Sequence, residues 1–216
     1  MIKCDKCKSF GLEFHSTTIS PHEFFEGKKD ADIWIIGLNP KGDIGKLETR
    51  TQKEFEDFNP DCHPYFKDFK KVSQKLYANW KSSNSRVAHT DLVKCYSNSF
   101  PPKIKIGDKE KEVKVDKLVD NCKVHLIKQI LDGKPKLIIC NGSTVCEEMI
   151  RMFPPLVKTE SIETLTSYKT ELKIGNENSH KFWIVLSGFI GRVDDRNKRR
   201  LGLEIEQILQ KENIIL

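Results

Sequence analysis

The segment from residue 31 to 42, ADIWIIGLNPKG, constrains the fold of this chain more than any other. Its centre, Ile33 to Gly37, is an uninterrupted apolar run, typical of a strand buried on both faces of a parallel sheet. The turn GLNP follows, and ligands of open α/β sheets bind at this end of a strand. Gly37 allows a ligand to approach the backbone closely, and Pro40 biases Asn39 away from the helical region. An ordinary strand-to-loop turn would have the same residues, so the segment indicates a site only together with others.

Further buried strands and amphipathic helices alternate along the chain. Strands are predicted at 86–95, 136–140 and 182–186, with a strand or hairpin at 165–174 on the rim. Helices are predicted after residue 63, where an aromatic stripe has helical spacing, and over 118–131, 145–152 and 199–210, with a shorter one near 51–58. This alternation predicts an α/β fold: one domain over residues 1–216, a three-layer α/β/α sandwich with a central, mostly parallel four-stranded sheet. The carboxyl edge of that sheet would bring Asn39, residues 89–91 and residues 187–192 together.

The charge and the apolar runs limit the function classes. The net charge of +6 and the pI near 8.8 suit a polyanionic partner such as nucleic acid, although many cytosolic proteins are as basic. Basic residues gather at 97–117, where a hairpin is predicted over 103–115, and at 192–200; a solvent-facing role would also explain them. No apolar run approaches the roughly 20 residues of a membrane span, and the first residues have no apolar leader, so we expect an intracellular, cytoplasmic protein.

Seven cysteines in such a chain are not expected to form structural disulfides. Cys140 and Cys146 fall in or beside apolar segments and are predicted to be small buried side chains, and Cys62 has no evident partner. The pair Cys4 and Cys7 has the spacing with which two thiolates bind one metal from a tight turn. Alone it fits half a zinc site, half an iron–sulfur site, or chance.

Three groups of segments, taken in their order along the chain, contain recognisable sequence motifs. The first is IIGLNP at residues 35–40. The second is TDLVKC at 90–95, followed by CKVHLIKQI at 122–130 and KPKLII at 134–139. The third is the last strand with its loop and the basic start of the final helix. In order and sub-spacing these segments resemble the uracil-DNA glycosylase superfamily, most closely its iron–sulfur, family-4-like branch, at low identity over most of residues 1–210.

The resemblance implies a DNA glycosylase acting in DNA repair as a monomer. It also assigns four cysteines to one metal site. That branch binds a [4Fe–4S] cluster through cysteines that correspond here to Cys4, Cys7, Cys95 and Cys122. The spacing between the last two is longer than in the family, and the predicted hairpin accounts for the insertion. Zinc also accepts four thiolates and is the alternative metal. The cluster would be structural.

The resemblance also implies roles at the site. Asn39 would position the attacking water, and the backbone around Gly37 and Leu38 would line the base pocket. Tyr65 or Phe66 would stack on the base, with Phe66 favoured. Contacts to DNA would come from Lys41, Phe189, Arg192, Lys198 and Arg199.

Two positions depart from the family pattern. Asp91 stands where the branch has an asparagine that reads the uracil edge, and an ionised carboxylate only accepts hydrogen bonds. Asp91 could prefer an edge with an amino group, or carry a raised pKa in a dry pocket. The loop after the last strand, SGFIGR, lacks the histidine that stabilises the base anion in the family. Ser187 could donate a neutral hydrogen bond there, Arg192 could supply a cation, and Phe189 or Ile190 could fill the gap left by a flipped base.

Two hypotheses follow from these patterns, with a third that is weaker. The first is a glycosylase that acts on deaminated or modified bases in DNA. The second is a non-catalytic nucleic-acid-binding member of the same fold. The third is an enzyme of free nucleotides or nucleosides, which Asp91 would favour if it reads an exocyclic amine.

Overall fold

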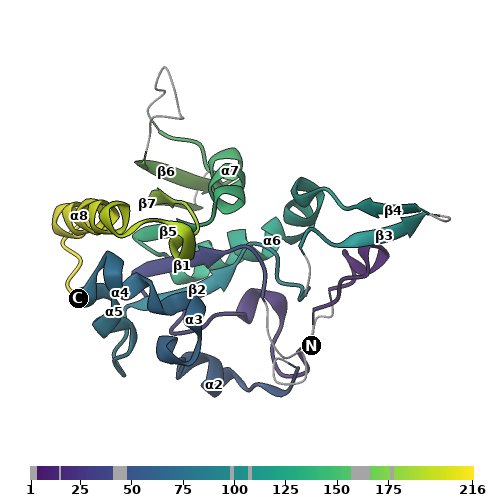
Figure 1. Ribbon diagram of the computed structural model, residues 1–216, viewed down its shortest axis with the longest axis horizontal. Helices are drawn as coiled ribbons and strands as arrows, with labels where there is room; N and C mark the ends of the chain where they lie inside the picture. Colours follow the sequence, from purple (N-terminus) through teal and green to yellow (C-terminus); the bar gives the residue numbers. More distant parts are fainter. Residues whose placement is uncertain are drawn as a thin grey trace.

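The fold is built on one central sheet with helices on both faces (Figure 1). The computed structural model describes residues 4–14, 16–40, 48–97, 100–106, 109–156, 166–175 and 178–216. Among these residues, no helix is both long and apolar enough to cross a bilayer.

The sheet has five strands in the order β2-β1-β5-β7-β6. Their bounds are Ile33–Gly37 for β1, Val87–Asp91 for β2, Leu137–Asn141 for β5, Ser167–Ile174 for β6 and Asn178–Ser187 for β7. The first four in the spatial order run parallel, and β6 pairs with β7 in the antiparallel direction. The four predicted parallel strands are therefore present, and the rim segment adds a fifth, antiparallel strand. The α/β class predicted from the alternating pattern is confirmed.

Two apolar cores lie on opposite faces of the sheet because the side chains of its strands alternate. In β1, Trp34 and Ile36 face the core beneath α6, whereas Ile33 and Ile35 face the core beneath α5 and α8. The helices are α2 Gln52–Glu56, α3 Pro64–Lys67, α4 Phe69–Val72, α5 Gln74–Trp80, α6 Val115–Gly133, α7 Ser143–Met152 and α8 Asp195–Lys211. Short 3₁₀ turns occur at Lys8–Phe10, Pro21–Glu23, Pro60–Cys62 and Ile190–Arg192.

The aromatic stripe after residue 63 is buried as predicted, but it does not belong to one helix. Ser73 has an extended backbone, and its Oγ accepts a hydrogen bond from the Leu76 N–H, so it ends α4 and caps α5. Serine competes for backbone hydrogen bonds in this way, which favours a helix start over a helix interior. The stripe therefore spans three short helices.

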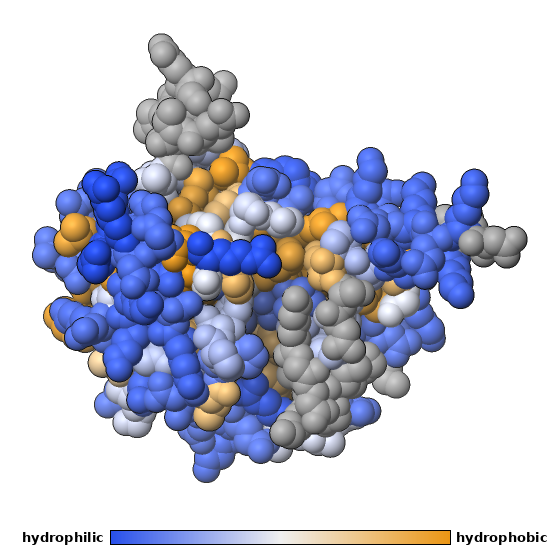
Figure 2. Space-filling model, viewed as in Figure 1, coloured by the Kyte–Doolittle hydropathy of each residue, from blue (hydrophilic) through white to orange (hydrophobic). Residues whose placement is uncertain are grey.

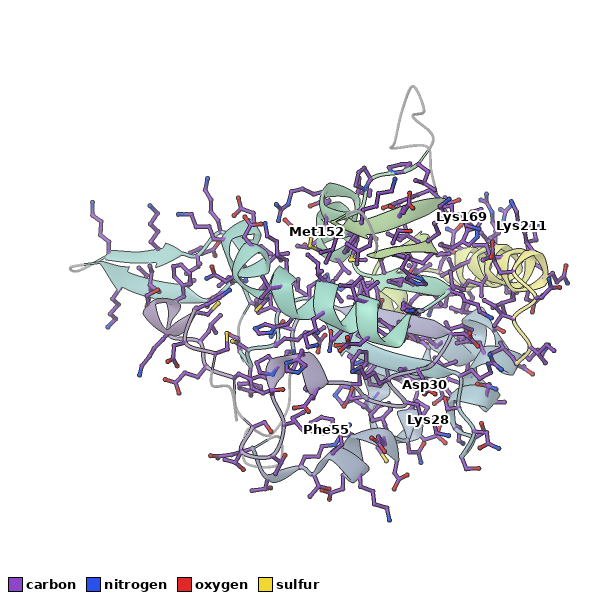
Figure 3. All side chains as sticks on the ribbon, turned by 180° about the vertical axis from the view of Figure 1, so that it is seen from behind. Lys28, Asp30, Phe55, Met152, Lys169 and Lys211 are labelled. Atoms are coloured by element: carbon purple, nitrogen blue, oxygen red, sulfur yellow. The ribbon has the colours of Figure 1, made fainter. Side chains whose placement is uncertain are left out.

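The predicted hairpin forms a separate two-stranded sheet, β3 Lys103–Ile106 and β4 Lys109–Glu112. It projects from the body of the molecule beyond the amino end of α6 (Figure 1). Its strands carry lysines and glutamates, and Figure 3 shows their side chains spreading to both sides of the ribbon. At the far end of the molecule, Lys169 and Lys211 lie close together in Figure 3, and both are near the Trp183 ring.

Helix α8 approaches α4 so closely that Gly202 admits no side chain. A Cβ at this position would lie under 3.0 Å from the Val72 carbonyl oxygen, which is backbone and cannot rotate away. We therefore expect Gly202→Ala to lower the free energy of unfolding by about 2–3 kcal/mol through overpacking. Thermal unfolding should show a Tm lower by roughly 5–10 °C for a chain of this size. The control is Leu203→Ala at the neighbouring position, which is 62% exposed; an equal Tm for both variants would contradict the close approach.

Candidate functional site

Four strands end together at the carboxyl edge of the parallel sheet. Gly37 at the end of β1 is in register with Asp91 at the end of β2, and Asn141 of β5 is in register with Ser187 of β7. The order of the strands reverses between β1 and β5, which is the switch point where ligands of open α/β sheets bind. The end of β1 therefore lies where the sequence predicted a site.

Gly37 leaves a small space that three polar side chains face. A Cβ at Gly37 would lie 2.9 Å from His89 Nε2 and 3.1 Å from the Tyr65 hydroxyl, and closer still to Asp91 Oδ1. These side chains come from β2 and α3. The arrangement places two buried polar groups beside the turn, where the sequence predicted that a ligand approaches Gly37.

Asp91 is buried, with 3% of its surface exposed. Burial raises the pKa of its carboxyl group to about 6, although the charges of His89 and Lys94 act in the opposite direction. The Lys94 ammonium is itself buried and donates hydrogen bonds to Thr90 Oγ1 at 2.6 Å and to Gln129 Oε1 at 2.8 Å. Burial therefore brings the pKa of Asp91 closer to neutrality than that of an exposed aspartate.

His89 was seen in the sequence only as part of a polar stretch, and the structure gives it a defined environment. Its Nδ1 lies 2.9 Å from Glu26 Oε2, and Glu26 Oε1 accepts from Arg50 at 2.7 Å. Its Nε2 is buried and has no hydrogen-bond partner among the described residues. Because strand side chains alternate, the position two residues before Asp91 already placed His89 on the same face; that was the available signal. For Glu26, which is 63 residues from His89 in the sequence, the sequence contained no such signal.

The Asn39 side chain is held in one orientation. Its Nδ2 donates to the carbonyl oxygens of Pro40 at 3.1 Å and Ser97 at 3.2 Å, and only 9% of the residue is exposed. These two bonds occupy both amide protons and leave Oδ1 as the acceptor of the group. Leu38, before it, is half-buried against the core beneath α6.

Aromatic rings in edge-on and tilted arrangements lie next to the polar groups. The Tyr65 ring lies 5.5 Å from the Phe189 ring and 6.0 Å from the His89 ring, and Arg192 lies 5.8 Å from the Phe189 ring centroid. Tyr65 is half-buried, whereas Phe66 is 4% exposed and packs against Trp80 in the core. The structure brings the Tyr65 hydroxyl next to Gly37, and it places the favoured Phe66 ring 4.8 Å from the His89 ring.

The polar side chains at the ends of β5 and β7, Asn141 and Ser187, make hydrogen bonds to the backbone at the sheet edge. The Ser187 hydroxyl donates to the Cys140 carbonyl oxygen at 2.8 Å, so its proton is already used. Asn141 Oδ1 accepts from the Ile190 N–H, and its buried Nδ2 has no partner among the described residues. The amide of Asn141 was not singled out in the sequence, although it directly follows the strand predicted at 136–140.

The basic residues differ in exposure. Arg192 and Arg199 are exposed, whereas Lys198 is 4% exposed and pairs with Asp68 at 3.3 Å. Lys198 therefore attaches α8 to the segment before α4 and does not face solvent. Lys41 lies outside the described residues. On the face shown in Figure 2, hydrophilic surface surrounds an apolar area between α8 and the β3–β4 hairpin.

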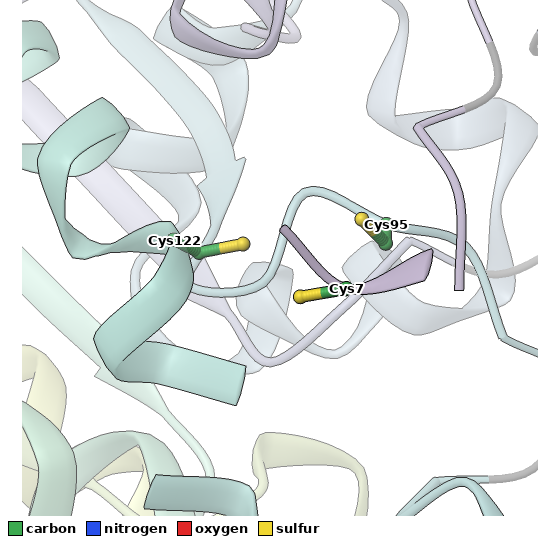
Figure 4. Close-up of side chains that lie close together, drawn as sticks. All are labelled: Cys7, Cys95 and Cys122. Carbon is green, nitrogen blue, oxygen red and sulfur yellow. The ribbon is translucent and has the colours of Figure 1, made fainter. Parts of the chain in front are cut away.

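Three of the four predicted metal ligands meet in the structure. The sulfurs of Cys7, Cys95 and Cys122 lie within 4.8 Å of one another and are buried (Figure 4). Hydrogen bonds from the thiols of Cys122 and Cys95 lower the pKa of Cys7 to about 3, and the bond with Cys7 raises that of Cys122 to about 11. Cys4 is half-buried and does not belong to this group. Three clustered thiols of this kind are a fit donor set for a thiophilic metal.

The parallel sheet, the polar side chains at its switch point and the cysteine group define an α/β protein with buried polar groups at the carboxyl edge of the sheet and three clustered thiols that could bind a metal. The family model of the uracil DNA glycosylase superfamily matches residues 24–187, more than half of the 216 residues. The chain therefore belongs to the uracil DNA glycosylase superfamily. No curated protein matches the chain.

Proposed function

We propose that this protein is a DNA glycosylase that hydrolyses the N-glycosidic bond of a deaminated or otherwise modified base. The observation that carries the proposal is the Asn39 amide, fixed by two hydrogen bonds in the turn after β1, at the switch point of a superfamily fold. Acting on DNA, the protein would work inside the cell.

The chemistry requires little from the protein beyond positioning. The glycosidic bond breaks with both electrons going to the base, a water oxygen bonds to the sugar carbon, and the water gives up a proton as the base is protonated. Asn39 Oδ1 accepts one hydrogen bond from that water and orients it. An amide is a poor general base, so bases that leave readily are the expected substrates.

The contacts to the nucleic acid follow from exposure. Tyr65 stacks on the flipped base, and Phe189 occupies the gap in the duplex. Arg192 and Arg199 contact phosphates, and their exposed guanidinium groups make binding dependent on salt.

We further propose that Cys7, Cys95 and Cys122 hold a [4Fe–4S] cluster with Cys4 as the fourth ligand. The compact thiol group supports a metal there, and zinc is the alternative. The metal ties the N-terminal arm and α6 to the loop after β2; it has no task in bond cleavage.

Asn39→Ala is expected to slow base release by about 10²-fold, because it removes the group that orients the water. The measurement is release from oligonucleotides carrying uracil, hypoxanthine, xanthine or mismatched thymine, with alkaline cleavage at abasic sites. Asn59→Ala, in the turn before Pro60–Cys62, is the control and should leave the rate unchanged. Equal rates for the wild type and Asn39→Ala would refute the role assigned to Asn39.

One observation favours a second candidate, a non-catalytic nucleic-acid-binding protein. The Ser187 proton is used within the sheet edge, and the loop 187–192 has no histidine. This candidate predicts salt-dependent DNA binding through the β3–β4 hairpin and residues 192–200, with no base release from any substrate.

A further inference from the structure

Two cysteines outside the metal-binding group lie together where β5 leads into α7. Cys140 belongs to β5 and Cys146 to α7, and their thiols are hydrogen-bonded to each other. The Cys146 Sγ also lies 3.7 Å from the Cys140 carbonyl oxygen. Cys140 is fully buried, as the sequence predicted, whereas Cys146 is only half-buried. The structure therefore places a protected thiol directly beside one that belongs to a partly exposed residue.

The two thiols differ in acidity because of their shared hydrogen bond and their burial. The bond from the Cys140 thiol lowers the pKa of Cys146. Burial raises the pKa of Cys140, and the bond with Cys146 raises it further. The thiolate is the form of cysteine that attacks an electrophile. Cys146 is thus both the more acidic and the more exposed residue of the pair, and cysteines that react with oxidants combine these two properties.

A buried hydroxyl group in the same core has no partner. Tyr168 of β6 is 4% exposed, and its hydroxyl makes no hydrogen bond within the described part of the chain. Burial raises the pKa of Tyr168, and the charges of Cys140 and Cys146 raise it further, so its hydroxyl lies near both sulfurs. A buried donor without an acceptor is costly. An oxygen atom added to the Cys146 sulfur would supply the acceptor that this hydroxyl lacks.

We propose that Cys140 and Cys146 form a redox pair that hydrogen peroxide converts to a disulfide, and that this disulfide regulates the adjacent edge of the sheet. The Cys146 thiolate attacks one peroxide oxygen, the O–O bond breaks, and the departing hydroxide takes up a proton as water. Cys146 is then a sulfenic acid. The Cys140 sulfur attacks the Cys146 sulfur, the S–O bond breaks, and the hydroxide leaves with the Cys140 proton as water. Each sulfur loses one electron, and the peroxide accepts both.

The turn between the two cysteines has room for this bond. Sulfurs that already share a hydrogen bond need only a short approach to reach bonding distance. Gly142 lies between them at the start of α7 with a φ of 126°, a conformation that glycine adopts without strain. The nearest atom to a Cβ built there is Val145 Cγ2 at 3.7 Å, so a small backbone rotation at Gly142 displaces no neighbour.

Ser187 and Asn141 connect the pair to the candidate site. The Ser187 carbonyl oxygen accepts a hydrogen bond from the Cys146 thiol at 3.3 Å, and a disulfide removes that donor. The disulfide also closes a ring that includes Asn141, whose Oδ1 accepts from the Ile190 N–H at 2.9 Å. Oxidation therefore disturbs both attachments of the loop 187–192. This regulatory part of the inference rests on the proposed function, whereas the formation of the disulfide does not.

The decisive experiment is a mass measurement on the anaerobically purified protein before and after treatment with hydrogen peroxide. One tryptic peptide, residues 137–151, contains Cys140 and Cys146 and no other cysteine. After alkylation in denaturant, the untreated protein should give this peptide with two alkyl groups. The treated protein should give it without alkyl groups and two hydrogens lighter than the dithiol, and dithiothreitol should reverse the change. A treated peptide that keeps both alkyl groups would overturn the inference.

Two variants separate the two steps. In Cys140→Ala the second thiol is absent, so Cys146 should remain a sulfenic acid that dimedone traps. In Cys146→Ser no disulfide forms, and the buried Cys140 should keep its thiol. Cys62 is the internal reference because it is exposed and lies outside the metal-binding group, and Cys146 should react with peroxide about tenfold faster. Equal reaction rates at Cys62 and Cys146 would contradict the activation of Cys146.

Tyr168→Phe tests the hydroxyl near the pair. Combined with Cys140→Ala, it should lower the yield of trapped sulfenic acid, because the oxidised sulfur loses its hydrogen-bond donor. An unchanged yield would exclude Tyr168 from the oxidation step.

Activity measurements test the regulatory part separately. Oxidised wild-type protein should release uracil or hypoxanthine from oligonucleotides roughly 3- to 10-fold more slowly, and dithiothreitol should restore the rate. Cys146→Ser under the same treatment should keep its rate, which distinguishes the disulfide from damage to the metal site. A disulfide that leaves the rate unchanged overturns the regulation.

Failure of the proposed function has a different signature. If no form of the protein releases a base, the proposed function fails, and the mass measurement still decides whether the disulfide forms. Binding of the same oligonucleotides then replaces base release as the readout of regulation. Weaker binding by the oxidised wild type, but not by treated Cys146→Ser, supports the regulation, and equal affinity of the oxidised and reduced protein overturns it.

Discussion

Replacing Cys95 by serine is expected to abolish the proposed metal binding and to lower the stability of the protein strongly. Cys95 lies between Cys7 and Cys122 in sequence and in the same buried thiol group, so the variant leaves an incomplete ligand set around a buried hydroxyl. Metal binding to such a site contributes directly to folding. We expect a loss of more than about 4 kcal/mol, which corresponds to a Tm lower by roughly 10 °C.

The measurements are the metal content of anaerobically purified protein, its visible absorption, and its thermal unfolding. Iron with sulfide would identify the proposed cluster, whereas zinc alone would identify the alternative. Cys62→Ser is the matched control because Cys62 is exposed and lies outside the thiol group. A Cys95→Ser protein with unchanged metal content and Tm would exclude the cysteine group as a metal site.

The second large effect is expected for Gly37→Ala. The added methyl group would occupy the space that His89 Nε2, Asp91 Oδ1 and the Tyr65 hydroxyl face, under 3.0 Å from the first two atoms. The buried polar side chains would have to move, and a displacement of about 1 Å costs roughly 10²-fold in rate. We therefore expect base release to fall by at least this factor.

Steady-state rates on uracil and hypoxanthine oligonucleotides measure this effect. Gly188→Ala is the matched control at the same sheet edge, because a Cβ there would have ordinary contact with Val193 at 3.5 Å. It should change the rate by no more than a few-fold. Wild-type activity in Gly37→Ala would mean that the base does not bind beside this glycine.

The strands were predictable because a strand buried on both faces is a continuous apolar run. The segments ending at Gly37, Asn141 and Ser187 all have this pattern, and each became a parallel strand. The helix after residue 63 was predicted with less success. The spacing of its aromatic residues predicted correctly that they are buried. It did not predict the helix break at Ser73, because that break depends on a local hydrogen bond from the Leu76 N–H to the Ser73 side chain.

The site was predictable in position and only partly in detail. Asp91 and Asn39 reach the same edge because both follow parallel strands. The bond between Glu26 and His89 joins an irregular arm to a strand, and no sequence period predicts such a contact. Tertiary packing also decided the exposure of Phe66 and Lys198, because helical position alone does not say which side chain the neighbouring elements cover.

The arm that carries Cys7 also protects an open sheet edge. Strand β2 is the last strand on its side of the sheet, and its backbone would be free to pair with another chain. Glu26 occupies part of that edge through two backbone hydrogen bonds with His89, of 2.8 and 2.7 Å. If metal loss releases the arm, the uncovered strand becomes a template for intermolecular pairing. Metal-depleted protein would then be lost to aggregation, so the cysteine group would govern the solubility of the protein as well as its folding.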